Sequence, residues 1–126
     1  MGKRIRYEFA KDVELLATRV NEVGKLGLDL SKVVFIRSWN SKSNAIARVL
    51  MLPSQWRFVL NSNILYVVEV IAERYEILSC QQKVGVILHE LTHLPKNMSG
   101  GLRAHNYKEF KVIKRKSEEI SKKICK

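Results

Sequence analysis

Cysteine, proline and histidine are scarce in this chain. Its 126 residues include two cysteines, two prolines and three histidines. Cys80 and Cys125 lie far apart and neither belongs to a Cys-x-x-Cys pair, so the sequence offers no thiolate zinc cage and no disulfide framework. We therefore expect two free cysteines, with Cys80 as a small buried residue and Cys125 as an exposed thiol, which fits a reducing compartment. A metal site in this chain would have to use histidine.

Long hydrophobic runs, linkers and repeats are also missing. No apolar stretch approaches the length of a membrane span, and the basic start of the chain leads into an amphipathic pattern, unlike a signal peptide. At 46% hydrophobic composition, the chain has enough apolar material to bury a core. These features predict one domain over residues 1–126, located in the cytoplasm and without a membrane partner.

Acidic residues are outnumbered by basic ones. The chain has 23 lysines and arginines against 12 aspartates and glutamates, a net charge of +11, and such a field attracts polyanions. The cations of the last predicted helix are Lys111, Lys114, Arg115, Lys116, Lys122, Lys123 and Lys126, and a second group near Trp39 and Trp56 comprises Arg37, Lys42, Arg48 and Arg57. Cations beside aromatic side chains are typical of nucleic-acid readers, although lysines also commonly solvate exposed faces. Binding of nucleic acid is therefore an alternative function.

The three histidines all fall in one short window, and two of them frame a glutamate in the order His89-Glu90-Leu91-Thr92-His93. Positions four apart on a helix lie one above the other, so His89 and His93 can point at one metal ion. Glu90 then lies beside the metal, where it can take a proton from a bound water. This HExxH spacing is the signature of zinc hydrolases.

The surroundings of the motif favour a helix over residues 79–94. Ser79 and Gln82 form a capping-box pattern, and Pro95 stops the helix. An apolar stripe anchors it to a core; its members are Val84, Ile87, Leu88, Leu91 and Leu94. The opposite side, with His89 and His93, carries small or apolar residues, as expected where a helix lines a cleft.

A catalytic zinc normally takes three protein ligands and leaves one position to water. His105 is the favoured third ligand, because Pro95 and the pair Gly100-Gly101 allow the intervening loop to fold back. Glu109 is the competing candidate. His105 follows His93 by twelve residues, which differs from the spacing of metzincins.

The order of elements predicts an α+β, zincin-like minimal domain with a small three-stranded sheet. We expect helices over residues 7–23, 79–94 and 106–124 and a short helix after Pro53. Strands are expected over residues 32–38, 45–51 and 64–71, the first two paired as a hairpin.

Residues 36–109 resemble the metallopeptidases of phages and archaeal viruses. The resemblance rests on Ser41-Lys42-Ser43, Ala45-Ile46-Ala47-Arg48, Tyr66-Val67-Val68-Glu69-Val70, the segment Val86 to Pro95 around the motif, and Ser99-Gly100-Gly101-Leu102-Arg103-Ala104-His105. It implies His89, His93 and His105 as zinc ligands and Glu90 as the catalytic base. Ala104 stands where the family often has proline, which makes the loop less rigid but removes no ligand. If the chain is viral, its compartment is the host cell.

These observations predict a zinc-dependent metallopeptidase that uses a zinc-activated water, with Glu90 as general base and a protein or peptide as substrate. Tyr107 and Arg103, both near His105, are candidate donors to the oxyanion of the intermediate. A zinc hydrolase of a non-peptide substrate, and a nucleic-acid-binding protein with a structural or idle zinc site, remain the alternatives.

Overall fold

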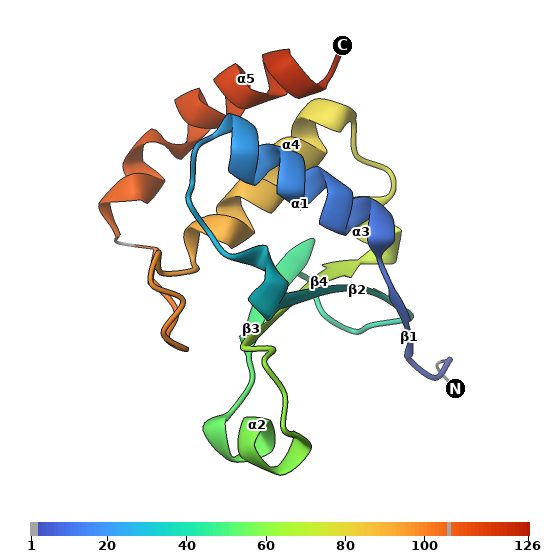
Figure 1. Cartoon of the computed structure of the whole chain (residues 1–126). Helices are drawn as coiled ribbons and strands as arrows, with labels where there is room; N and C mark the ends of the chain where they lie inside the picture. The colour runs from blue at the N-terminus through green and yellow to red at the C-terminus, as the bar shows by residue number, and fades with distance from the viewer. Residues whose placement is uncertain (1–2, 106) are drawn as a thin grey trace.

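The computed structural model describes residues 3–105 and 107–126, which form a mixed four-stranded sheet and five α-helices (Figure 1). The strands are β1 (Arg6–Phe9), β2 (Val33–Trp39), β3 (Ala47–Met51) and β4 (Tyr66–Ile71). The helices are α1 (Lys11–Val23), α2 (Ser54–Leu60), α3 (Ala72–Tyr75), α4 (Cys80–Thr92) and α5 (Ile113–Ile124), with 3-10 turns η1 (Leu30–Lys32) and η2 (Lys108–Val112). The predicted α+β class is confirmed.

The sheet has the strand order β1-β2-β4-β3, so the expected hairpin of β2 and β3 is wrong. β4 lies between them, parallel to β2 and antiparallel to β3. Five of the six residues of β4 are buried, which is the pattern of a central strand covered on both faces. Because β4 takes the centre, β3 becomes an edge strand.

A fourth strand was missed at the start of the chain. The helix expected from residue 7 begins at Lys11, and Arg6–Phe9 instead form β1, antiparallel to β2. In the sequence, Phe9 fits the helical spacing of the apolar residues that follow it, but in the fold its side chain is exposed. The Ala10 N–H donates to the Phe35 carbonyl, and this bond fixes the passage from β1 into α1.

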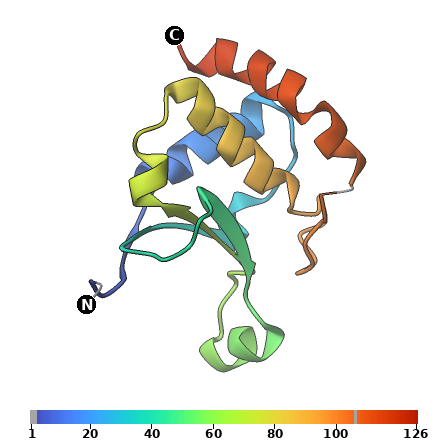
Figure 2. The same cartoon turned by 180° about the vertical axis from the view of Figure 1, so that it is seen from behind.

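Helices α1, α4 and α5 pack together on one side of the sheet (Figures 1 and 2). The capping box of α4 is formed as predicted, since the Ser79 hydroxyl accepts from the Gln82 N–H and the Gln82 side chain accepts from the Ser79 N–H. All five members of the apolar stripe on this helix are buried in the core. Gly85 lets α5 approach α4 closely, because a Cβ there would lie 3.2 Å from the Ser117 hydroxyl.

The end of the chain differs from the sequence prediction in two ways. The expected helix over residues 106–124 is divided into η2 and α5, and its predicted first residue, Asn106, lies outside the described residues. Cys80 and Cys125 form a disulfide that joins the start of α4 to the residue after α5. The expectation of two free cysteines, with Cys80 buried, is wrong: Cys80 is exposed and Cys125 half-buried. The inference of a reducing compartment from free thiols falls with it.

The connection from β3 to β4 leaves the body of the molecule. It contains α2, which both views place away from the three long helices (Figures 1 and 2). The short helix after Pro53 is confirmed, whereas the short α3 was not predicted. Within the described residues, no helix is long and apolar enough to cross a membrane.

Candidate metal site

Helix α4 and its C-cap supply three residues of the site. His89 and Glu90 lie in its last turns, and His93 is the C-cap residue, still in helical conformation. The buried stripe of α4 fixes the rotation of the helix against the core, so the face with His89 and His93 points away from that core. The predicted placement of two imidazoles on one helix face is therefore found.

The loop after α4 returns His105 to the same place. Gly100, with φ of 100°, and the buried Met98, with φ of 51°, supply left-handed turns that reverse the chain. The buried Tyr66 hydroxyl on β4 holds the loop on two sides, since it accepts from the Gly100 N–H at 2.8 Å and donates to the Gly101 carbonyl at 2.9 Å. One side chain of the central strand thus anchors the loop before it reaches His105.

A reciprocal pair of hydrogen bonds ties the loop to the end of α4. The Arg103 N–H donates to the His93 carbonyl at 2.7 Å, and the Arg103 carbonyl lies 2.6 Å from Nδ1 of His93. A carbonyl only accepts, so Nδ1 carries the proton and Nε2 keeps its lone pair. This is the arrangement that orients metal-binding imidazoles.

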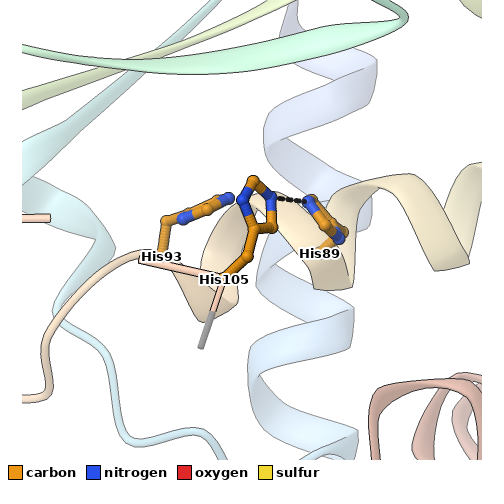
Figure 3. A group of neighbouring side chains, drawn as sticks. All are labelled: His89, His93 and His105. Carbon is orange, nitrogen blue, oxygen red and sulfur yellow. Dashed lines mark hydrogen bonds between the residues drawn. The ribbon is translucent and has the colours of Figure 1, made fainter. Parts of the chain in front are cut away.

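The three histidines converge in one cluster (Figure 3). One ligand nitrogen from each of His89, His93 and His105 lies within 4.8 Å of the others, and the Nε2 atoms of His89 and His105 are 3.0 Å apart. Burial lowers the pKa of His89, and His93 and His105 lower it further. Neutral imidazoles are the form that binds a metal, so this donor set fits a divalent ion of the borderline type.

Glu90 lies beside this cluster and is buried, with 7% of its surface exposed. Burial raises the pKa of Glu90 to about 7. A carboxylate with that pKa exchanges protons readily near neutral pH, which is the property of a general base or acid.

His89 lines several clefts. One of about 520 Å³ runs along α4 and is lined by Ile46, Ala47, Leu78, Gln82, Gly85, Val86, His89 and Glu90. A second, of about 350 Å³, brings Ala47, Arg48 and Val49 of the edge strand β3 opposite the histidines and Glu90. The predicted cleft beside α4 is confirmed, and β3 forms its far wall.

A family model described as "Putative phage metallopeptidase" matches residues 5–126. The chain belongs to the phage metallopeptidase family. Neither the curated proteins nor the solved structures include a match to it. The family implies a metal, and the three neighbouring imidazoles of this chain are the group that could bind it.

Three side chains singled out in the sequence are not part of the histidine cluster or of the clefts beside Glu90. Glu109 is absent from the histidine cluster and lines a separate small cavity with Lys25, Lys96 and Lys116. Arg103 also lines that cavity, and its guanidinium lies 4.0 Å from the centre of the Tyr107 ring. Neither Arg103 nor Tyr107 lines the clefts beside Glu90, so the structure does not support them as oxyanion donors.

The cations expected near Trp39 and Trp56 do not gather in one cluster. Arg37 pairs with Asp12 and Glu76, and Arg48 pairs with Glu69. Arg57 belongs to α2. The aromatic residues expected beside these cations separate as well, because Trp39 donates to Glu8 whereas Trp56 lies on α2.

Two residues close to the histidines were not predicted from the sequence as part of the site. Phe110 fell only within the expected helix over residues 106–124, but its ring lies 4.9 to 5.3 Å from the centres of all three histidine rings. Tyr66 was read only as part of a strand. No local sequence pattern marks either residue as part of the site, because both reach it through tertiary packing.

Proposed function

We propose that this chain is a zinc-dependent peptidase of zincin type, in which His89, His93 and His105 hold the ion and Glu90 is the general base. The observation that carries the proposal is the convergence of three imidazoles beside a buried glutamate in a cleft. A zinc ion bound by three histidines keeps an open position and acts as a Lewis acid toward water and a peptide carbonyl.

Glu90 performs the proton transfers. It takes a proton from the water as the water oxygen bonds to the peptide carbonyl carbon. When the carbon–nitrogen bond breaks, Glu90 gives that proton to the leaving amine. Its buried position and raised pKa suit both steps, because the neutral and charged forms are close in free energy near pH 7.

The edge strand β3 supports a peptide as the substrate. Its inner edge pairs with β4, and its other edge pairs with no strand in the described residues, so backbone groups remain for an extended chain. Residues Ala47 to Val49 of this strand line the cleft that contains His89 and Glu90. A peptide added along β3 would pass the site.

The test combines metal content with activity. We expect about one zinc per chain by elemental analysis, weaker retention in His105→Ala, and unchanged retention in Glu109→Gln, the matched variant of the competing ligand. Glu90→Gln is expected to keep the metal and to lose peptidase activity by at least about a hundredfold on a casein and peptide panel.

Two results would contradict the proposal. Equal zinc retention in wild type and His105→Ala would remove His105 from the ligand set. Hydrolysis of a nucleic acid or small amide, without any of the peptide panel, would leave the metal site intact but assign it another substrate.

A further inference from the structure

Helix α2 exposes an unusual amount of apolar surface for a helix in water. Trp56 is 60% exposed, Phe58 77%, Val59 79% and Leu60 60%. None of the seven residues of α2 is buried. The chain just before the helix adds the exposed Leu50 and Met51. Contiguous apolar surface of this kind marks a contact with another body.

The apolar side chains surround the helix. At 100° per residue, Phe58 and Val59 differ by about 100°, while Trp56 and Leu60 project from the side roughly opposite Phe58. Arg57 alone is half-buried and points toward the body, where its guanidinium lies near Gly100. A helix that docks in a protein groove has one apolar stripe. A helix that is apolar on most sides must instead be surrounded by an apolar medium to remove that surface from water.

The segment that contains α2 is cationic in sequence. From Asn40 to Val68 the chain contains no aspartate or glutamate, and its charged residues are Lys42, Arg48 and Arg57. Arg48 pairs with Glu69 and Arg57 is half-buried, so the attraction to an anionic surface comes mainly from the net charge of +11 on the whole chain.

Several backbone groups at the ends of α2 are paired within the chain. Pro53 has no N–H to leave unpaired, and its carbonyl accepts from the Trp56 N–H. At the other end, the N–H groups of Asn61 and Ser62 donate to the carbonyls of Phe58 and Arg57. The Ile64 N–H donates to the Ser62 hydroxyl. Internal pairing of these groups lowers the cost of entering a lipid interface.

We propose that α2 is a wedge that enters the headgroup region of an anionic lipid bilayer. Seven residues give a helix of about 10 Å, which suits an interfacial depth of about 5–10 Å and is far too short to span. The absence of a long apolar run predicted no membrane partner, and the exposure of α2 becomes visible only in the fold. The proposal does not depend on the metal site.

Vesicle sedimentation of the full chain tests the wedge. We expect binding to phosphatidylcholine vesicles containing a third phosphatidylglycerol, weaker binding to pure phosphatidylcholine, and loss of binding as salt is raised. The double variant Phe58→Ser/Val59→Ser should lower the partition coefficient at least about tenfold, because both side chains lose burial in lipid. It should fold normally, since both residues are highly exposed.

The matched control removes equal apolar exposure elsewhere. Phe9 and Ile77 are each 83% exposed and lie outside α2, so Phe9→Ser/Ile77→Ser should bind vesicles like wild type. Brominated lipid should quench the tryptophan fluorescence of wild type more strongly than that of Trp56→Phe, because Trp39 is outside the wedge.

Three results would overturn the proposal. Equal vesicle binding by both double variants would mean that charge alone attracts the protein. In the second result, the wild type fails to bind vesicles and forms a dimer that Phe58→Ser/Val59→Ser converts to a monomer. That result would show that α2 contacts a second copy of this chain. Absence of vesicle binding with salt-dependent retention on DNA would assign the cationic surface to nucleic acid.

Discussion

The Tyr66 hydroxyl connects the centre of the sheet to the loop that carries His105. It is fully buried, and it both donates to and accepts from backbone groups of the glycine pair. A buried donor and acceptor that lose their partner cost more than the bond itself contributes. At the scale of single residues, this hydroxyl therefore controls whether the third histidine stays beside the other two.

Tyr66→Phe is expected to destabilise the fold by about 1–3 kcal/mol and to weaken zinc binding at least about tenfold, because the loop loses both hydrogen bonds. Urea unfolding of metal-free protein measures the first effect. Competition with a chromophoric chelator, and the visible spectrum of the cobalt-substituted protein, measure the second.

Tyr75→Phe is the control for this substitution. Tyr75 is as buried as Tyr66, and burial raises its pKa to about 12, but its hydroxyl does not contact the loop. It should leave zinc affinity unchanged. A cobalt spectrum and chelator competition curve for Tyr66→Phe that match wild type would show that the loop holds His105 without Tyr66.

The residues of the site differ in how far the sequence could predict them. The spacing of His89, Glu90 and His93 is a local property of one helix, and the fold keeps it. The return of His105 required a loop that closes, which Pro95 and Gly100 indicated without fixing its direction. Phe110 and Tyr66 join the site through tertiary packing, and no pattern along the chain encodes that.

At the scale of elements, the disulfide joins the start of α4 to the end of α5. Serine at both Cys80 and Cys125 should lower the free energy of unfolding by about 2–4 kcal/mol, because the bond closes a loop with a sequence separation of 45. Urea unfolding of oxidised protein, of reduced protein and of the double serine variant measures this. Reduction should reproduce the double variant and leave that variant itself unaffected.

Identical urea midpoints for oxidised and reduced wild type would contradict the bond between α4 and α5. The spacing of the two cysteines does not predict the bond, because cysteines distant in sequence meet only when α5 packs against α4. The strand order escaped prediction for a related reason. Local alternation identifies strands, but the choice of neighbours depends on which strand needs burial on both faces, and that strand is β4.

At the scale of the whole molecule, Arg37 connects the sheet to two helices. Its guanidinium makes two hydrogen bonds to Asp12 of α1, at 2.7 and 2.9 Å, and two to Glu76 after α3, at 2.6 and 3.0 Å. The hydrogen bond from Arg37 lowers the pKa of Asp12 from its ordinary 3.8. A lowered pKa in the folded state means that the charged carboxylate stabilises the fold above about pH 4, and that this contribution is lost as the pH falls through the lowered pKa.

Asp12→Asn should therefore destabilise the protein between pH 5 and 8 by at most about 1 kcal/mol, because the Asp12 side chain is 60% exposed. The difference from wild type should shrink as the pH falls below about 4 and through the lowered pKa of Asp12. Urea midpoints measured across this range test it. Glu22→Gln, an exposed change on the same helix, should show no such trend, and a constant Asp12→Asn difference down to pH 2 would contradict the assignment.

The cationic surface near the end of the chain is interrupted by acidic residues. Six of the seven cations listed near the end of the chain are exposed, but Glu118 and Glu119 of α5 are exposed among them. The vesicle and DNA experiments distinguish contact of the apolar side chains of α2 with lipid from a general attraction of the positively charged protein to polyanions.

The contact between His93 and position 103 has a consequence for how variants of this protein are read. The group that orients His93 is the peptide carbonyl of residue 103, and the arginine side chain there turns toward Tyr107. A mutational scan would record position 103 as permissive, since most side chains leave the carbonyl in place. Proline at that position would remove the N–H that donates to the His93 carbonyl. If proline alone is not tolerated at position 103, the protein requires the backbone hydrogen bonds there and not the arginine side chain.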